Sequence, residues 1–197
     1  MILRWILCAV IPYLLGSISF GILLTRHTGR DIRKEGSGNT GATNALRVFG
    51  FKTGMMTFLL DILKAAVAVI VGRLLLDENG AMLAGLCVVI GHNWPVFFGF
   101  KGGKGIACSS AVLVLCYPIP ALIAIAVCLL AITLTRYVSL GSMLMLVCYA
   151  VIIACTKPLW PHTVWAVTLA LLGIWRHRAN IVRLIKGTES KISFRKK

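Results

Sequence analysis

The sequence predicts an all-α integral membrane protein, a polytopic bundle of about seven transmembrane helices. Of its 197 residues, 58% are hydrophobic and only 14% are charged, whereas a soluble domain carries about 25% charged residues. The apolar residues gather in long runs, and most basic residues lie in short segments between those runs. These observations indicate that lipid surrounds most of the chain.

The first apolar run covers residues 2–24 and contains one charged residue, Arg4. It is long enough to cross a hydrocarbon core about 30 Å thick. No cleavage site follows it, and Thr25-Arg26 end it, so we expect an uncleaved first helix rather than a signal peptide.

Hydropathy predicts six further spans, over residues 53–76, 81–98, 105–117, 120–135, 139–156 and 163–175. A turn at Asp77–Gly80 separates the first two of these. Pro118 and Pro120 divide the run 105–135, because proline removes a backbone donor and bends a helix. Residues 105–117 are too few to span the bilayer alone, which favours a half-helix or re-entrant segment. Five spans is the alternative count.

The distribution of charge predicts the orientation of the chain. The segments 25–52, 99–104, 136 and 176–197 hold 17 of the 21 lysines and arginines. Cytoplasmic loops carry an excess of these residues, so we expect those segments and the C-terminus in the cytoplasm and the N-terminus outside. The net charge of +15 does not indicate a nucleic-acid partner, because the basic residues lie between hydrophobic spans.

The sequence gives no sign of a metal site or another cofactor. The seven cysteines all lie in or beside apolar runs and form no CxxC pair, which is typical of cysteine acting as a small hydrophobe. No two histidines have metal-ligand spacing, and no Gly-x-Ser-x-Gly elbow is present. We therefore predict no metal and no cofactor.

The first polar segment contains a run of glycine, hydroxyl and amide residues from Glu35 to Arg47. Such residues let backbone N–H groups approach an anion, and residues 42–47 can open a helix whose N-terminus favours phosphate. Arg47 can hold a phosphate or carboxylate through two hydrogen bonds. A flexible glycine-rich loop is the alternative, but the density of polar groups beside a membrane favours binding.

The second segment, residues 91–105, places glycines on both sides of Lys104. This arrangement suits an oxyanion or phosphate, although it is not a Walker A loop, because Gly105 rather than Ser or Thr follows the lysine. The alternative is a turn between two helices with a lysine that reaches the membrane surface.

In the third segment, His177, Asn180 and Arg183 recur at a spacing that places them along one stripe of a helix. The alternative is a basic amphipathic anchor that binds anionic lipid. Asp61 and Lys64 lie three residues apart inside the second predicted span, where ionisable residues indicate function by default and a structural ion pair is an equal alternative.

Together these segments resemble the bacterial acyl-phosphate:glycerol-3-phosphate acyltransferases, small integral membrane enzymes of phospholipid synthesis. The matching stretches are residues 16–21, 36–47, the Asp61/Lys64 pair, and residues 91–105, 136–140 and 177–191. The resemblance implies one acyltransferase domain over residues 1–197, in the bacterial inner membrane, with its active-site loops on the cytoplasmic side.

The resemblance also implies the reaction. A fatty acyl group would pass from acyl phosphate to the 1-hydroxyl of glycerol 3-phosphate, giving lysophosphatidic acid and phosphate, without a cofactor. The implied partners are the two substrates, the lipid bilayer and, functionally, a soluble enzyme that produces acyl phosphate. No nucleic acid is expected.

By match to the family motifs, we expect four catalytic residues: Ser37, Lys104, His177 and Asn180. The expected substrate-binding residues are Gly38, Asn39, Thr43, Asn44, Arg47, Lys101, Gly102, Gly103, Ser142 and Glu189. Our hypothesis is that Lys104 and Arg47 bind phosphate, while Asn180 and Ser37 orient the hydroxyl and the carbonyl. His177 is either the general base or an orienting donor, and the leaving phosphate is the other candidate for the base.

Two rival classes are weaker. A transporter or lipid-binding protein would place its polar groups near the membrane midplane, whereas here most are predicted at one face. An acyl-CoA-dependent transferase would show a His-x-x-x-x-Asp pattern, but Asp31 follows His27 one residue too early.

Overall fold

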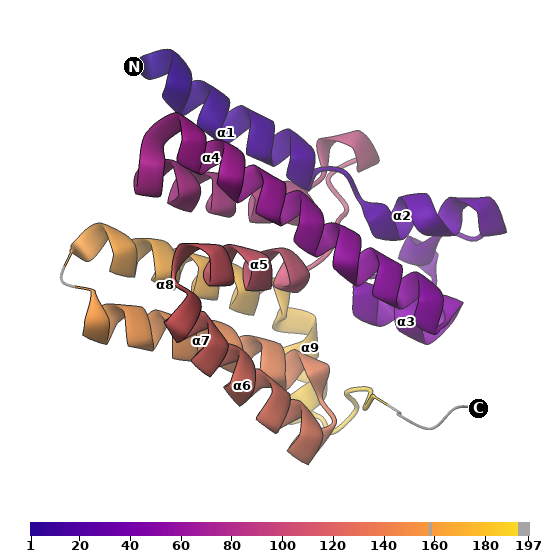
Figure 1. Ribbon diagram of the computed structural model, residues 1–197. Coiled ribbons are helices and arrows are strands. Elements are labelled where there is room, and N and C mark those ends of the chain that lie inside the picture. The colour runs from indigo at the N-terminus through magenta and orange to yellow at the C-terminus, as the bar shows by residue number, and fades with distance from the viewer. Residues whose placement is uncertain (158, 193–197) are drawn as a thin grey trace. The chain divides into compact units, whose positions relative to one another are not determined.

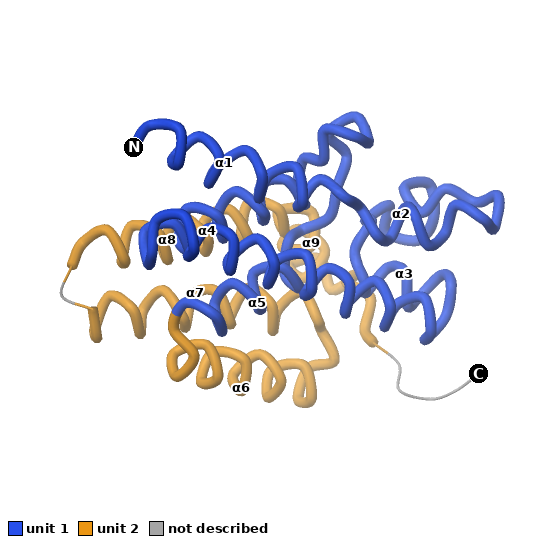
Figure 2. The backbone as a smooth tube through the Cα atoms, turned by 45° about the horizontal axis from the view of Figure 1, so that its top comes forward, with its two compact units in different colours: residues 1–116 blue, residues 117–197 orange. Residues whose placement is uncertain are grey.

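The computed structural model describes residues 1–157 and 159–192, and over these residues it is built from helices, turns and loops without strands (Figure 1). The prediction of an all-α fold is confirmed. The chain divides into two compact units, residues 1–116 and 117–197 (Figure 2). Of the basic tail predicted at 176–197, the last five residues lie outside the described part.

Unit 1 contains five α-helices and three short 3₁₀ turns among its residues, all of which are described. In chain order they are α1 (Ile2–Gly16), α2 (Phe20–Thr25), η1 (Arg26–Thr28), η2 (Ile32–Lys34), α3 (Ala42–Phe49), α4 (Phe51–Asn93), η3 (Val96–Phe98) and α5 (Ile106–Cys116). The described residues of unit 2 form α6 (Pro118–Thr135), α7 (Val138–Thr156), α8 (Trp160–Arg176) and α9 (Arg178–Ile185).

The long helix α4 is two helical arms joined at a sharp bend. Leu76 and Asp77 leave the helical conformation, and Asp77 has a φ of 51°. A methyl group at Gly72 would lie 2.3 Å from the carbonyl oxygen of Gly80, so the two arms lie in backbone contact beside the bend. The predicted turn at 77–80 is therefore present as a bend at Leu76 and Asp77, while the second arm ends at Asn93 rather than at 98.

The first apolar run is not one continuous helix, as residues 2–24 were expected to be. The helix α1 ends at Gly16 and α2 begins at Phe20. At the break, the Ser17 hydroxyl donates to the carbonyl oxygen of Tyr13 at 2.9 Å and accepts from the backbone N–H of Val96 at 3.3 Å. The Ser17 hydroxyl therefore links the end of α1 to the start of η3.

Glycines let α1 and the second arm of α4 pack with their backbones in contact. A methyl group at Gly16 would lie 2.2 Å from the carbonyl oxygen of Val88, and one at Gly91 would lie 2.2 Å from that of Tyr13. Small residues at helix contacts are the common means of close packing in a membrane, where lipid tails compete with apolar side chains.

In unit 2, α7 packs against both α6 and α8. The connection between α6 and α7 is only two residues long, so these helices run antiparallel as a hairpin. Tyr117 and Tyr149 each contact Trp165 edge to face, with ring centroids 6.3 and 6.2 Å apart. This aromatic cluster ties the start of α6 to the middle of α7 and α8.

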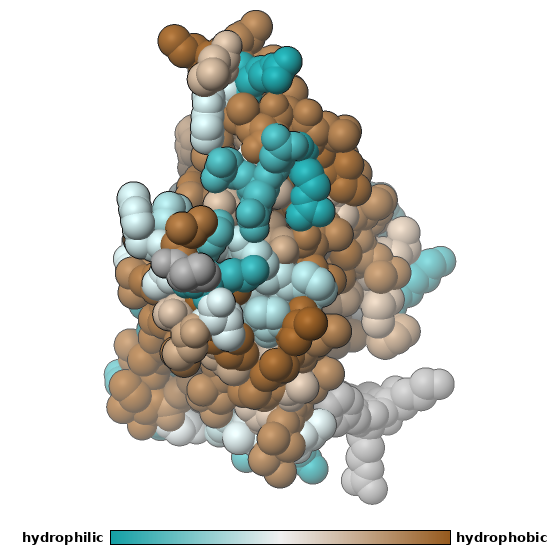
Figure 3. Space-filling view, turned by 60° about the vertical axis from the view of Figure 1, so that its left-hand side comes forward, coloured by the Kyte–Doolittle hydropathy of each residue, from teal (hydrophilic) through white to brown (hydrophobic). Residues whose placement is uncertain are grey.

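The surface of the protein suits a lipid environment. Among the described residues, three helical stretches are long and apolar enough to cross a membrane: Ile2–Thr28, Pro118–Thr135 and Val138–Thr156. Large apolar side chains are widely exposed, with Leu74 at 82%, Leu134 at 76% and Ile119 at 71%. Figure 3 shows apolar residues over most of the face in view, with hydrophilic groups in a smaller area. A water-soluble monomer rarely exposes apolar patches of this extent.

The glycine contact between α1 and α4 gives a stability prediction. We expect Gly91→Ala to lower the free energy of unfolding by about 1–3 kcal/mol, because the added methyl overpacks against backbone. Thermal unfolding of the detergent-solubilised protein measures the change. Val10→Leu, at an exposed position of α1, is the control and should unfold like wild type. Equal melting temperatures for the two variants would contradict the close packing.

Candidate active site

The glycine-rich loop between η2 and α3 is wound around the side chain of Asn44. The amide oxygen of Asn44 accepts the backbone N–H of Ser37 at 2.9 Å, and its amide nitrogen donates to the carbonyl oxygens of Glu35 and Asn39, each at 2.9 Å. Asn44 is only 2% exposed. Its side chain therefore organises the loop from the inside, a role that its sequence position alone did not reveal.

Two glycines of this loop adopt the left-handed conformation that favours glycine. They are Gly36 with φ 56° and Gly38 with φ 70°. A methyl group at Gly36 would lie 2.4 Å from the amide oxygen of Asn44. The resulting turn leaves Ser37 and Gly38 exposed, and Thr43 and Arg47 are exposed on the following helix α3. The helix anticipated after residue 41 is confirmed as Ala42–Phe49.

Two exposed ion pairs lie at the start of this loop and in the segment just before it. Arg30 contacts Glu35 at 2.8 Å, and Arg33 contacts Asp31 at 2.9 Å. The hydrogen bonds from Arg30 lower the pKa of the Glu35 carboxyl, and those from Arg33 lower the pKa of Asp31. Both carboxylates are thus neutralised by a neighbouring guanidinium, and the segment keeps a positive balance around Ser37 and Arg47.

The second glycine-rich segment, residues 99–105, lies directly against the end of α4. The backbone N–H of Gly103 donates to the carbonyl oxygen of His92 at 3.0 Å. A methyl group at Gly102 would lie 2.1 Å from that oxygen, and one at Gly103 would lie 2.0 Å from the His92 ring nitrogen Nε2. These glycines are required by close approach to His92. Beside them Lys101 is exposed and Lys104 is half-buried.

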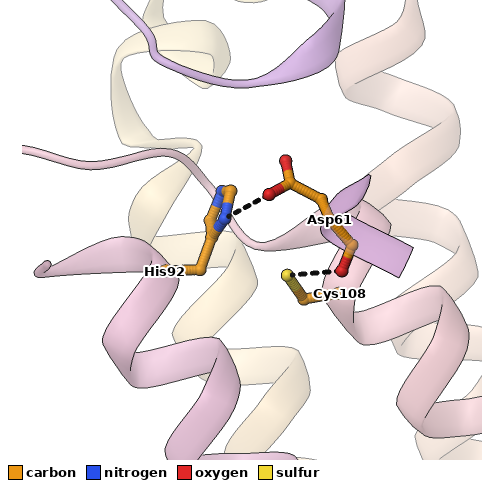
Figure 4. Close-up of side chains that lie close together, drawn as sticks. All are labelled: Asp61, His92 and Cys108. Atoms are coloured by element: carbon orange, nitrogen blue, oxygen red, sulfur yellow. Dashed lines mark hydrogen bonds and ion pairs between the residues drawn. The ribbon is translucent and has the colours of Figure 1, made fainter. Parts of the chain in front are cut away.

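His92 belongs to a buried polar cluster inside unit 1. The ammonium of Lys64 lies 2.9 Å from Oδ1 of Asp61 and 3.1 Å from Nδ1 of His92. Figure 4 shows the Asp61 carboxylate and the His92 ring facing one another, with the Cys108 thiol against the backbone oxygen of Asp61. The exposed fractions of Asp61, Lys64 and His92 are 1%, 5% and 5%. The intramembrane pair noticed in the sequence is therefore an ion pair with a histidine as its third member.

Asp61, His92 and Cys108 are close enough to one another to hold a metal ion. However, the Lys64 ammonium is within hydrogen-bond distance of both Asp61 and His92, and so already supplies a cation to them. The Cys108 thiol donates to the carbonyl oxygen of Asp61 at 3.4 Å. The donor set fits an internal ammonium better than a metal.

In unit 2, Glu189 gathers the third polar segment around one carboxylate. Its Oε1 accepts from the Ser139 hydroxyl at 2.8 Å and from the Asn180 amide at 2.6 Å, and its Oε2 accepts from Nε of Arg183 at 2.7 Å. Asn180 and Arg183 lie on α9, as the predicted stripe required, whereas Ser139 lies on α7. The carboxylate therefore ties the tail and α9 to the start of α7.

The state of Glu189 follows from these contacts. Burial raises the pKa of the carboxyl, but the hydrogen bonds from Asn180, Ser139 and Arg183 outweigh it, so the pKa lies below its ordinary value of 4.5. The carboxylate is consequently charged at neutral pH. Ser139, which sequence reasoning left without a role, is found here because its hydroxyl faces the one acidic residue of the tail.

His177 sits at the junction of α8 and α9 and is 2% exposed. Its Nδ1 lies 2.7 Å from the carbonyl oxygen of Gly173. A carbonyl can only accept, so Nδ1 must carry the proton, and in the neutral ring Nε2 holds the lone pair. The ring is thus held in the tautomer that can accept a proton at Nε2. On α7, the Ser142 hydroxyl donates to the carbonyl oxygen of Val138 at 2.8 Å.

The structure thus brings the predicted residues together in groups within each unit. Unit 1 joins Ser37 and Asn39 of the first loop to Asn44 of α3, and it places Gly102 and Gly103 beside His92. Unit 2 joins Asn180 to Glu189, near His177 in the chain. His92 was not among the predicted site residues. The signal that points to it is the buried Asp61/Lys64 pair, since an intramembrane ammonium needs several acceptors.

The fold and these segments define an integral membrane protein whose basic and glycine-rich segments suit anionic groups. The family described as glycerol-3-phosphate acyltransferase matches residues 6–187. The chain is 48% identical over 191 residues to a glycerol-3-phosphate acyltransferase of Thermoanaerobacter pseudethanolicus, covering 95% of each chain. It is 43% identical over 202 residues to the enzyme of that name in Halalkalibacterium halodurans, covering 98% of each.

Two solved structures have the same fold. The crystal structure of the integral membrane glycerol 3-phosphate acyltransferase PlsY (YgiH) in its glycerol 3-phosphate form matches with a TM-score of 0.91 and 36% identity over 96% of both chains. Its lysophosphatidic acid form matches with a TM-score of 0.87. The present chain belongs to the glycerol-3-phosphate acyltransferase family, and it is an integral membrane enzyme of phospholipid synthesis.

The Glu189 contacts predict a pH dependence of stability. Because the folded pKa is depressed, the stabilising contribution is present above the ordinary value of 4.5 and is lost as pH falls through the lower folded pKa. We expect Glu189→Gln to lower the melting temperature at pH 7 and to reduce its dependence on pH in the acidic range. Replacing a hydrogen-bonded charge costs about 1.5–3 kcal/mol.

The matched control for Glu189→Gln is Asp77→Asn, which changes an exposed carboxylate in the bend of α4. Melting curves in detergent between neutral and acidic pH measure both variants. A Glu189→Gln protein with the wild-type melting temperature and pH profile would show that the carboxylate does not stabilise the tail.

Proposed function

We propose that this acyltransferase takes its acyl group from acyl phosphate and transfers it to the 1-hydroxyl of glycerol 3-phosphate. The hydroxyl oxygen forms a bond to the carbonyl carbon, while the bond from that carbon to the phosphate oxygen breaks. The hydroxyl proton passes to a base, and the products are lysophosphatidic acid and inorganic phosphate. The whole chain, residues 1–197, acts as a single catalytic domain.

The observation that carries this proposal is the chemistry of the two polar segments of unit 1. An Asn44-braced loop beside the exposed Arg47 and a glycine-rich segment beside Lys104 both suit phosphate groups. Both proposed substrates carry phosphate. The related crystal structures, described as a glycerol 3-phosphate form and a lysophosphatidic acid form, support the identities of the acceptor and the product.

Acyl phosphate is already an activated donor, so positioning and charge stabilisation can supply much of the rate. In the proposal, Arg47 and Lys104 bind phosphate oxygens, Gly102 gives the phosphate close access to the backbone, and Gly103 holds the segment against His92 through its N–H. Gly38, Asn39, Thr43 and Lys101 contribute further contacts in unit 1, as Ser142 does in unit 2. Ser37 and Asn180 orient the hydroxyl and the carbonyl. Asn44 and Glu189 hold these groups in place through the hydrogen bonds described above.

The proton has two candidate acceptors. The bond from His177 Nδ1 to Gly173 leaves the lone pair of the neutral ring on Nε2, which supports His177 as the general base. The leaving phosphate is the second candidate, because it becomes more basic as the acyl bond breaks. A substitution at His177 separates the two.

We propose further that the enzyme lies in the bacterial inner membrane with its basic segments in the cytoplasm, its C-terminus inside and its N-terminus outside. The excess of lysine and arginine in those segments supports this orientation. A soluble enzyme that produces acyl phosphate would then reach the same side of the membrane and supply the donor.

The donor assignment predicts a specific assay result. Purified protein in detergent, given acyl phosphate and labelled glycerol 3-phosphate without coenzyme A, should form labelled lysophosphatidic acid. Replacing acyl phosphate by acyl-CoA in a parallel reaction should give no product. Product from acyl-CoA alone would overturn the donor assignment while leaving the enzyme a glycerol-3-phosphate acyltransferase.

The base assignment predicts that His177→Gln lowers kcat by about 10²–10⁴-fold and removes a titrating group from the pH profile of kcat. The control is His27→Gln, because His27 is exposed on η1 and should be replaceable without loss of kcat. A His177→Gln enzyme with near-normal kcat and an unchanged pH profile would assign the proton to the leaving phosphate.

A further inference from the structure

The buried ammonium of Lys64 lies where the first apolar run breaks. It donates to the carbonyl oxygen of Gly16 at 3.0 Å and to that of Ile18 at 2.7 Å. Gly16 ends α1, and Ile18 lies in the break before α2. Carbonyl groups at a helix end have no partner within the helix, and in lipid no water replaces it. Lys64 therefore satisfies the backbone at this break.

The same ammonium is shared with two side chains of α4. It contacts Oδ1 of Asp61 at 2.9 Å and Nδ1 of His92 at 3.1 Å. The Asp61 carboxylate supplies the negative charge that a buried ammonium needs. Nδ1 of His92 also lies 3.5 Å from Oδ1 of Asp61, so this ring nitrogen faces both members of the ion pair. Lys64 and Asp61 together thus set the orientation of the His92 ring.

The other edge of that ring faces the second glycine-rich segment. Its Nε2 lies 2.0 Å from the point where a Cβ atom of Gly103 would be, and the His92 carbonyl oxygen accepts the Gly103 N–H. No side chain fits between the ring and the backbone. Rotation of the ring would therefore displace Gly103, and with it the adjacent Lys104.

We propose that Lys64 is a positioning residue for acyl transfer, acting through His92 on the segment Gly102–Lys104. The inference rests on the proposed function, which assigns phosphate binding to that segment. Lys64 touches neither substrate in this proposal. It holds the ring against which the phosphate-binding backbone is built, and Asp61 holds Lys64.

Lys64→Met tests this role, because it keeps a side chain of similar length and removes the charge and the three donors. We expect KM for a phosphate-bearing substrate to rise about 10–100-fold, which is the cost of losing one hydrogen bond to a charged group. We expect kcat to stay within about threefold of wild type, since no group at the reacting bond is removed. Lys52→Met, at an exposed position of the same helix, is the matched control and should leave both constants unchanged.

A merely structural role gives a different result. Loss of folded protein lowers the apparent kcat, because fewer active molecules are present, but it does not change KM of the molecules that remain folded. Unchanged KM values for both substrates in folded Lys64→Met enzyme would overturn the proposal. The double variant Lys64→Met/His92→Leu should raise KM no more than either single variant, since one effect passes through the other. Additive increases would contradict the path through His92.

A measurement on the wild-type protein covers the case in which Lys64→Met does not fold. Nitrogen-15 NMR of ring-labelled histidine in detergent reports whether a ring nitrogen is hydrogen-bonded and whether the ring is fixed, and the His92 signal is identified by its loss in His92→Asn. We expect a fixed His92 ring with a hydrogen bond at Nδ1. A His92 ring that rotates freely would overturn the proposal. The donor assay distinguishes failure of the proposed function from failure of this inference. If wild-type enzyme forms product from acyl-CoA but not from acyl phosphate, the donor assignment is wrong. The role of Lys64 is then still tested by comparing KM for glycerol 3-phosphate between wild-type and Lys64→Met enzyme.

Discussion

The fold of unit 1 depends on a single buried contact, the ammonium of Lys64 among four oxygen and nitrogen atoms. Within a membrane, a helix can end only where some other group satisfies its last carbonyls. Lys64 does this for Gly16 and Ile18, and so permits the chain to leave α1 and begin α2 as a separate helix. The glycine-rich loop follows from α2, and the second glycine-rich segment follows from His92, so both polar segments of this unit are connected to the same ammonium.

Asn44 and Glu189 likewise satisfy hydrogen-bonding groups of a polar segment with one buried or part-buried side chain. Asn44 satisfies three backbone groups of the first loop with one neutral amide, while Glu189 accepts three side-chain donors with one carboxylate. In each case a polar side chain placed among potential partners replaces the regular hydrogen bonding that a loop lacks. Lys64, Asn44 and Glu189 thus each stabilise a loop or a break between helices.

Hydropathy was sufficient to predict the all-helical class and the approximate position of most helices, because in a membrane the length and polarity of a helix are constrained directly by lipid. It missed the break at 17–19, since Ile18 keeps the run apolar and Lys64, which satisfies the carbonyl group of Ile18 in the break, lies 46 residues away in the sequence. The order of motifs was enough to identify the family. It could not show that Asn44 bonds inward, that Ser139 meets Glu189, or that His92 completes the Asp61/Lys64 pair, because each depends on contacts between distant parts of a unit.

The inward bonding of Asn44 has a consequence for the thermodynamics of ligand binding. A glycine-rich loop ordinarily samples many conformations, and a ligand that orders it must repay the lost entropy out of its own contacts. Here three internal hydrogen bonds have already selected one conformation, with Gly36 and Gly38 in their left-handed turns. That entropy is lost once, during folding, and an anion that meets the loop at Ser37 retains more of its contact energy as affinity.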